Sequence, residues 1–459
     1  MSLSEKLKKE LKEQLPQCRI LDDNAARIAY AYDNSKIHKQ PDLVILPRQE
    51  SEVLTVLKFC NKHLIPVTAR GRGTGTTGAS VPIKQGIVLS FEQMNRIIET
   101  NGNDRYMIVE PGVTNQEIQQ NAQKQGFFWA PDPTSAAFCT VGGNLAYNSA
   151  GPRAVKYGTP RDNTLGLHAI TGNAEKIITG VYTTKGVVGY DLTRLIIGSE
   201  GTLAIITRAT LKLTPLAPCK ISYLAYYPTI ETASEAVASI MAQPITPCTL
   251  EFIDGQALNL IRDAQPQLDI PKNAQALLMI EIDGQKMGLQ EAAEKVIHLA
   301  NNHESTTIMQ AFNSSEMWRV RKALSPILRN FAPNKINEDV VVPVSKLPEL
   351  ISGLQHISKQ FAIPIVNFGH AGNGNIHTNL LYDKNNLSHE KNKMPCLNAV
   401  FELVLKLNGT LSGEHGIGLV KRKYIDKEIT QSTLKVMTRI KQQFDFNHIL
   451  NPEKIFPTT

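Results

Sequence analysis

Four side chains near the C-terminal end of the sequence could bind and activate a small polar substrate. His370 and His377 flank a run of glycine and asparagine, and Glu414 directly precedes His415. Two histidines and one carboxylate form the ligand set of an open catalytic metal site, which keeps positions for substrate oxygens. Adjacent residues in extended backbone point in opposite directions, so His415 is left to act as a general base.

A predicted β-hairpin would bring the two histidines side by side. Residues 363–368 have the apolar pattern of a strand, the glycine and asparagine run predicts a sharp turn, and residues 376–381 predict the returning strand. Strand alternation would place Asn375, His377 and Asn379 on one face. From the residues alone, two unrelated loop histidines are the more common outcome for an arbitrary pair, and that alternative stays open.

A glycine-rich loop at residues 70–78 could bind an anion, because glycine leaves backbone N–H groups unobstructed. Its Gly73-x-Gly75-x-x-Gly78 spacing matches the dinucleotide-binding pattern, but residues 79–85 contain Pro82 and lead straight into another strand. A Rossmann loop must open a helix, and a P-loop must end in Gly-Lys-Ser/Thr, so both motifs are excluded. Alone, the loop fits a structural turn equally well. Two later glycine-rich stretches, 140–151 and 198–203, favour a long ligand lying along the backbone.

The elements around these motifs divide the chain into four predicted parts. Residues 1–40 form an N-terminal helical segment whose spacing of leucines predicts an amphipathic helix that docks on the body. Residues 41–215 alternate short β-rich runs with helical ones, and the prolines at 215 and 218 end that pattern. Residues 219–410 predict a cap domain with a split βαβ, ferredoxin-like arrangement, and residues 411–459 return to the active site.

Composition limits the class of protein. The 459 residues are 42% apolar and 20% charged, which is typical of a globular chain. The net charge is +7, and the basic residues are scattered along the sequence. We interpret this charge as a mild bias toward anionic ligands and expect no nucleic-acid partner.

No apolar run is long enough to span a membrane, and none of the six cysteines forms a Cys-x-x-Cys pair, so we predict no membrane span and no iron–sulfur site. We expect a reducing, cytoplasmic location, or a peripheral one at the membrane through an electron-acceptor partner.

The three glycine-rich loops, in this order and spacing, resemble the FAD-binding domain of the flavoproteins grouped with vanillyl-alcohol oxidase and para-cresol methylhydroxylase. The likeness runs from about residue 41 to residue 456 and is strongest for the branch of D-lactate dehydrogenase and the glycolate oxidase FAD subunit. It implies an α+β fold, with a two-subdomain FAD-binding domain, a ferredoxin-like cap and a C-terminal helical return.

The resemblance also implies how the cofactor is bound. Thr74 stands where some relatives carry the histidine that attaches FAD, which implies a non-covalent cofactor. The first loop would hold the pyrophosphate, the region after residue 140 would lie along the flavin, and the 198–203 stretch would contact the adenine half. The residues assigned to FAD are Arg70, Gly71, Arg72, Gly73, Thr74, Gly75, Thr76, Pro133, Thr140, Gly142, Gly143, Asn144, Ser149, Gly201, Ile205 and Ile206.

In the resembling family the matching residues bind a divalent metal, which assigns His370, His377 and Glu414 as ligands and His415 as the base. Zinc is the expected ion, with manganese or iron as alternatives. Many relatives have aspartate where this chain has Asn373, so a nearby negative charge is lost and the metal affinity is left open. The resemblance assigns the substrate carboxylate to Arg321, because a guanidinium binds a carboxylate bidentately, with Ser325 and Asn379 as further contacts.

The implied activity is oxidation of a D-2-hydroxy acid, D-lactate or glycolate, to the 2-oxo acid with hydride passing to flavin N5. Three alternatives stay open: a D-2-hydroxyglutarate dehydrogenase, an oxidase that passes electrons to oxygen, and a non-catalytic FAD sensor or scaffold. Because the chain has no iron–sulfur ligands of its own, we expect its electron acceptor to be a quinone, a cytochrome, an electron-transfer protein or an iron–sulfur partner subunit. We also allow for a homodimer.

Overall fold

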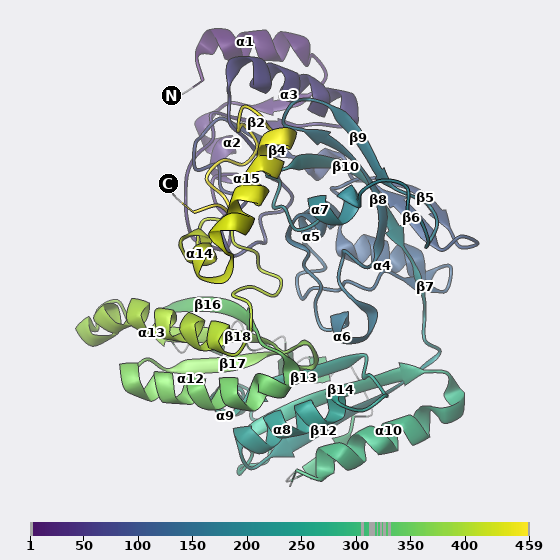
Figure 1. Cartoon of the computed structure of the whole chain (residues 1–459), viewed down its shortest axis with the longest axis vertical. Helices are drawn as coiled ribbons and strands as arrows, with labels where there is room; N and C mark the ends of the chain where they lie inside the picture. The colour runs from purple at the N-terminus through teal and green to yellow at the C-terminus, as the bar shows by residue number, and fades with distance from the viewer. Residues whose placement is uncertain are drawn as a thin grey trace. The chain divides into compact units, whose positions relative to one another are not determined.

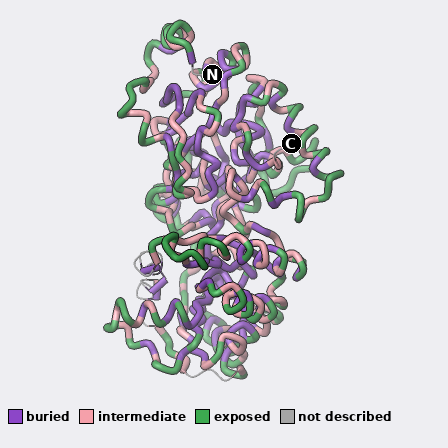
Figure 2. Tube along the Cα trace, turned by 90° about the vertical axis from the view of Figure 1, so that its left-hand side faces the viewer, coloured by how far each residue is buried: buried purple, intermediate pink, exposed green. Residues whose placement is uncertain are grey.

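The computed structural model describes residues 3–303, 307–311, 317–318, 320–321, 324, 327–328 and 332–457. It has an α+β fold that divides into two compact units (Figure 1). The first unit consists of Met1–Ala150, Gly158–Leu216 and Glu414–Thr459, and the second of Gly151–Tyr157 and Ala217–Gly413. Each unit has its own hydrophobic interior, visible as buried stretches of the chain trace in Figure 2.

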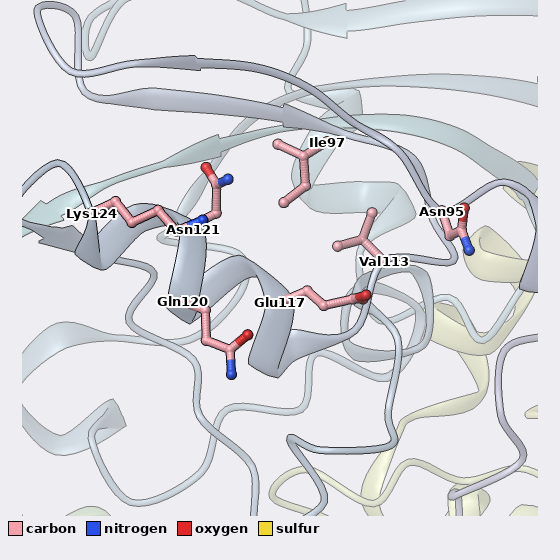
Figure 3. A pocket seen from close by; sticks show the side chains of 7 residues that line it. All are labelled: Asn95, Ile97, Val113, Glu117, Gln120, Asn121 and Lys124. Atoms are coloured by element: carbon pink, nitrogen blue, oxygen red, sulfur yellow. The ribbon is translucent and has the colours of Figure 1, made fainter.

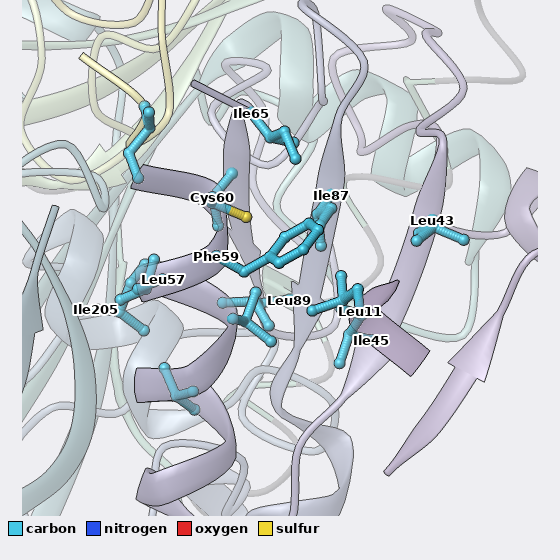
Figure 4. Packing of buried hydrophobic residues seen from close by; sticks show 14 of the residues in the cluster. Leu11, Leu43, Ile45, Leu57, Phe59, Cys60, Ile65, Ile87, Leu89 and Ile205 are labelled. Atoms are coloured by element: carbon cyan, nitrogen blue, oxygen red, sulfur yellow. The ribbon is translucent and has the colours of Figure 1, made fainter. Parts of the chain in front are cut away.

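The first unit begins with a four-stranded sheet in the order β1-β2-β4-β3. Three of its strands are parallel, because β2 (Leu43–Leu46) and the edge strand β3 (Val67–Arg70) each pair parallel with β4 (Ile87–Ser90). Helix α3 (Glu50–His63) connects β2 to β3 and buries Val53, Val56, Leu57 and Cys60, the i, i+3, i+4, i+7 stripe of an amphipathic helix. Figure 4 shows this core.

The N-terminal segment docks on this sheet, as its leucine spacing predicts. Helix α1 (Glu5–Gln14) begins at Ser4, whose side chain accepts the Leu7 N–H, and buries Leu11 fully in the core. The segment is not purely helical, however. Strand β1 (Arg19–Leu21) pairs antiparallel with β2 at the sheet edge and is followed by α2 (Asn24–Ile28). Three residues are too few for a periodic pattern to reveal such a strand.

A second, antiparallel sheet of the first unit has the order β5-β6-β10-β8-β9 and its own core around Trp129. Helix α4 covers this part and starts with a capping box between Thr114 and Glu117. The returning C-terminal segment is helical, as expected. The further elements of this unit are η1 (Phe91–Gln93), β5 (Ile97–Asn101), β6 (Tyr106–Val109), α4 (Asn115–Gln123), β7 (Phe127–Phe128), α5 (Val141–Tyr147), β8 (Thr164–Thr171), β9 (Lys176–Gly180), α7 (Leu192–Ile196), β10 (Ala204–Lys212), β11 (Thr214–Pro215), η4 (Arg422–Tyr424), α14 (Ile425–Glu428) and α15 (Gln431–Phe444).

The second unit is built on one antiparallel sheet in the order β15-β12-β14-β13-β17-β18-β16. Its first four strands have the ferredoxin-like order predicted for the cap, with α8 and α10 as the crossover helices. Strands β17, β18 and β16 extend this sheet, and α10, α8, α12 and α13 are neighbours in one row of helices. The elements are α6 (Ala154–Tyr157), β12 (Cys219–Tyr227), α8 (Ile230–Met241), β13 (Thr249–Asp254), α9 (Gly255–Ala264), β14 (Ala276–Gly284), α10 (Lys286–Asn301), β15 (Thr307–Gln310), β16 (Asn334–Val341), η2 (Val344–Lys346), α12 (Leu347–Phe361), β17 (Ile365–His370), η3 (Ala371–Asn373), β18 (Asn375–Tyr382) and α13 (Leu387–Lys406).

Within the described residues, none of the helices combines the length and the apolar character needed to cross a membrane.

Candidate active site

The β17–β18 hairpin holds His370 and His377 against each other in the second unit. The rings lie at right angles with their centroids 5.1 Å apart, and both side chains are buried. The turn requires Gly374, which has φ +71° and whose hypothetical Cβ would lie 1.9 Å from the carbonyl oxygen of Val342. The juxtaposition expected from the strand–turn–strand pattern is therefore present.

A buried carboxylate, Glu251 on β13, links the histidine pair to Arg321. Its Oε1 lies 2.5 Å from His370 Nδ1, and its Oε2 accepts a hydrogen bond from Arg321 Nε at 3.0 Å. The Arg321 guanidinium also lies over the Phe368 ring, 4.5 Å from its centroid. Burial alone would raise the pKa of Glu251, but His370 and Arg321 together lower that pKa to about 2. Glu251 is therefore held as a charged carboxylate.

Sequence reasoning missed Glu251. Its signal was an acidic residue between the apolar residues Leu250 and Phe252 of a fully buried strand, Thr249–Asp254, where an unpaired charge would be very costly. That pattern predicts a cationic partner but does not identify which residue it is.

Two further residues predicted to contact the substrate have different outcomes. Asn379 is fully buried on β18, where its side-chain amide donates to the carbonyls of Val366 and His377. Its Oδ1 has no hydrogen-bond partner among the described residues, so this acceptor is available to a bound molecule. Ser325 lies outside the described residues.

Gly413, the residue before Glu414, is fixed within the second unit. Its N–H lies within hydrogen-bonding distance of both the carbonyl oxygen and Oδ2 of Asp339, at 2.9 and 3.0 Å. Asp339 on β16 is the register partner of His377 on β18. Glu414 is the first residue of the returning segment of the first unit, where its Oε2 accepts the Ala150 N–H at 3.3 Å.

The glycine-rich loop of the first unit joins two parallel strands, β3 and β4, as the sequence predicts, and no helix follows it. It lies so close to helix α5 that side chains would not fit: a Cβ on Gly71 would lie 2.4 Å from Thr140 Oγ1, and one on Gly75 would lie 2.5 Å from Tyr147 Oη. Thr76 Oγ1 is buried and has no hydrogen-bond partner within the part of the chain that the structure describes. A backbone cradle with an unsatisfied hydroxyl fits a large polar cofactor.

Further residues assigned to the cofactor also lie in the first unit. Thr140 caps helix α5 by accepting the Gly143 N–H, and Asn144 is buried one turn later. Arg70 is buried and donates to the carbonyl oxygen of Ala29. Arg72 instead pairs with Glu92.

Ile205 and Ile206 point into two different hydrophobic clusters of the first unit. Any contact they make with a cofactor would therefore come from their backbone. Gly201 precedes this strand in a loop with φ +69°, a conformation that favours glycine.

A pocket of about 330 Å³ elsewhere in the first unit is lined by none of the residues assigned to the cofactor, metal or substrate. Figure 3 shows it beside helix α4, with a lining that is mainly polar, and we assign it no ligand. Its lining residues are Asn95, Ile97, Val113, Glu117, Gln120, Asn121 and Lys124.

Two domain families match successive parts of the chain. Residues 41–180 match the FAD binding domain, and residues 218–455 match the C-terminal domain of FAD linked oxidases. The chain is 36% identical to glycolate oxidase subunit GlcD of Bacillus subtilis, covering 98% of this chain and 97% of the relative. It is 32% identical to mitochondrial D-lactate dehydrogenase [cytochrome] of Arabidopsis thaliana, covering 98% and 80%.

A solved structure of p-cresol methylhydroxylase has the same fold, with a TM-score of 0.79, 15% identity, and coverage of 99% of this chain and 98% of the other. The resemblance inferred from the three loops is thus confirmed at the level of family and fold. The chain belongs to the FAD-linked oxidases, and its fold is that of p-cresol methylhydroxylase.

Proposed function

We propose that this protein is an FAD-dependent dehydrogenase that oxidises a D-2-hydroxy acid, D-lactate or glycolate, to the 2-oxo acid. The observation that carries the proposal is the buried cluster in which Glu251 contacts both His370 and Arg321. In this cluster one carboxylate, that of Glu251, contacts both a candidate metal ligand, His370, and the cation proposed to bind the substrate carboxylate, Arg321. The names of relatives that match nearly the whole chain support the same substrate class.

We propose His370, His377 and Glu414 as ligands of a divalent metal ion. The donor set suits such an ion, because imidazole and carboxylate ligands are those of zinc, manganese and iron sites. Glu251 engages Nδ1 of His370, so Nε2 is the ring nitrogen that would face the metal. The attachment of Gly413 to Asp339, opposite His377, supports Glu414 as the third ligand because it is the next residue along the chain.

The chain's own residues would then bind the substrate and move one proton. The Arg321 guanidinium binds the substrate carboxylate, with Asn379 and Ser325 as further contacts. His415 accepts the proton of the 2-hydroxyl group. When bound, the metal ion supplies Lewis acidity at the hydroxyl oxygen, and FAD supplies the hydride acceptor, its N5 atom.

For the cofactor, we propose that the backbone of residues 71–76 holds the FAD pyrophosphate without a covalent bond. The close approach of Gly71 and Gly75 to helix α5 supports this, since the loop presents backbone instead of side chains. Thr76 Oγ1 is the buried hydroxyl that a bound cofactor would satisfy.

We further propose that the electrons leave to a separate protein or to a quinone. The six cysteines are far apart in the sequence and include no Cys-x-x-Cys pair, so the chain has no iron–sulfur ligand motif of its own. The relatives' names, an oxidase subunit and a cytochrome-linked dehydrogenase, support a protein acceptor.

The test is anaerobic stopped-flow reduction of the FAD-loaded protein by D-lactate, L-lactate, glycolate and D-2-hydroxyglutarate, each with and without a chelator. We expect rapid bleaching of the flavin by D-lactate or glycolate, slow bleaching by L-lactate, and loss of the fast phase with the chelator. Bleaching by D-2-hydroxyglutarate alone would replace the proposed substrate. Absence of bleaching by all four acids would overturn the proposed function, and rapid reoxidation by air would identify an oxidase.

The role of His415 is tested by His415→Ala, with His356→Ala as the matched control because His356 is exposed on helix α12. We expect His415→Ala to bind FAD and metal but to lose the fast reduction by roughly 10²- to 10⁴-fold. The control should behave like the unmodified protein. Full turnover by His415→Ala would rule out this histidine as the base.

A further inference from the structure

Glu200 makes an unusual pair of contacts in the first unit. It lies in the loop between α7 and β10, is almost fully buried, and has φ +52°, a left-handed conformation that non-glycine residues seldom adopt. Its Oε1 accepts the Ile417 N–H at 2.6 Å, and its Oε2 accepts the Gly418 N–H at 2.8 Å. One carboxylate therefore holds two successive backbone amides that lie more than two hundred residues away in the sequence.

The same segment is held from a second side by Thr77. The Thr77 carbonyl accepts the N–H groups of Leu419 and Val420 at 2.8 and 3.2 Å, and its hydroxyl donates to the His415 carbonyl at 3.1 Å. Space is also limited, since a Cβ on Gly416 would lie 2.6 Å from Glu200 Oε1. Residues 415–420 are therefore held by hydrogen bonds with Glu200 and Thr77 and not by the backbone hydrogen bonds of a helix or strand.

Burial and the neighbouring groups act in opposite directions on the charge of Glu200. Burial raises the pKa of Glu200 to about 7, while the two amides and the nearby side chains of Lys454 and Lys421 act in the opposite direction. Both lysines are themselves buried. Asn451 adds a further contact, because its amide donates to the Glu200 carbonyl at 2.7 Å.

We propose that Glu200 is a positioning residue that places His415 for proton abstraction by clamping the backbone of residues 417 and 418. This inference rests on His415 being the base in the proposed function. The clamp needs both carboxylate oxygens. A glutamine of the same shape offers one acceptor and turns an NH₂ donor toward the second amide, so it can keep at most one of the two bonds.

The test compares Glu200→Gln with Glu110→Gln, both prepared with saturating FAD. Glu110 is the matched control because it is a buried carboxylate in the same unit that bonds Arg96 instead of the 415–420 segment. Hydrogen exchange of peptides spanning residues 415–420 reports the clamp directly. Anaerobic flavin reduction reports its consequence, as a maximal rate and a half-saturating substrate concentration.

For Glu200→Gln we expect faster exchange at Ile417 and Gly418, a maximal reduction rate lower by roughly tenfold to a hundredfold, and an unchanged half-saturating concentration. Glu110→Gln should leave all three quantities as they are. An unchanged reduction rate in Glu200→Gln would overturn the proposal, even with faster exchange, because Glu200 would then be a structural anchor and nothing more.

Two further variants keep the test decisive. If Glu200→Gln does not fold, Thr77→Val removes the hydroxyl bond to the His415 carbonyl. We expect it to slow reduction severalfold, and an unchanged rate would overturn the inference. His415→Ala separates this inference from the proposed function: if His415→Ala is inactive while Glu200→Gln is fully active, the positioning role alone fails. If His415→Ala is fully active, the base assignment itself fails.

Discussion

Glu251 and His370 are joined across two adjacent strands by a buried contact of 2.5 Å between Oε1 and Nδ1. The carboxylate accepts a hydrogen bond from Nδ1–H, which fixes the imidazole tautomer and the plane of the ring. The other oxygen of the same carboxylate holds Arg321. A change at Glu251 should therefore affect both a proposed metal ligand and a proposed substrate contact.

We predict that Glu251→Gln lowers the affinity for a divalent metal ion by roughly 10- to 100-fold. The substitution replaces the charged carboxylate that contacts His370 with a neutral amide. Calorimetric titration of metal-free protein with Zn²⁺ or Mn²⁺ measures this without any turnover. Glu281→Gln is the matched control, since Glu281 is a buried carboxylate on the neighbouring strand β14 that bonds Ser222. Equal metal affinities for the two variants would contradict the prediction.

Arg321 offers a second prediction, for substrate affinity. Arg321→Lys keeps the positive charge but loses the planar fork that meets a carboxylate with two hydrogen bonds. A hydrogen bond to a charged group contributes about 1.5–3 kcal/mol, so we expect the half-saturating D-lactate concentration to rise by roughly tenfold or more. Arg262→Lys on α9 is the control and should leave that concentration unchanged. If both variants reduce flavin with the same substrate dependence, Arg321 does not bind the carboxylate.

The third prediction concerns cofactor binding in the first unit. A methyl group on Gly71 would lie 2.4 Å from Thr140 Oγ1, so Gly71→Ala should push the loop away from helix α5 and reduce the bound FAD. The ratio of flavin to protein absorbance after gel filtration measures the loss. Gly284→Ala in the second unit is the control, because its nearest neighbouring atom would be 3.8 Å away. Full FAD occupancy in Gly71→Ala would show that the loop does not need this close approach.

Sequence reasoning succeeded where the governing interactions are local. The hairpin that carries His370 and His377 follows from a strand pattern, turn residues and a second strand within twenty residues, and Gly374 supplies the left-handed turn. The amphipathic stripes of α3 and α12 were equally readable, since a 3.6-residue period is a property of one segment.

The contacts that could not be predicted from the sequence depend on which strands and segments become neighbours in the fold. Glu251 lies 119 residues before His370, and the two meet because β13 lies next to β17 in the sheet. Alternation along a strand tells which side chains share a face but does not give the strand order. For the same reason the contact of Glu200 with the segment after His415 was not predictable. A charged residue in an apolar run shows that a partner must exist, and the fold decides which one.

The last prediction is a pH dependence that belongs to Asp254. This residue ends β13 and caps α9, where Oδ1 accepts the Ala257 N–H and Oδ2 accepts the Asn367 N–H. Burial raises its pKa to about 7. The folded protein therefore holds this proton more tightly than the unfolded chain, whose aspartate pKa is about 3.9. The resulting stabilisation is complete below that lower value and is lost as the pH rises through 7.

We accordingly expect the difference in unfolding free energy between the unmodified protein and Asp254→Asn to decrease as the pH rises from about 4 to 7, by at most about 1.4 kcal/mol per pH unit. The sequence has two tryptophans, Trp129 in the first unit and Trp318 in the second. Urea unfolding followed by fluorescence in a Trp129→Phe background therefore reports the second unit, which contains Asp254. A difference that stays constant over this range would show that Asp254 is ionised at the same pH in the folded and unfolded chains, because only a shifted pKa can make the two stabilities diverge with pH.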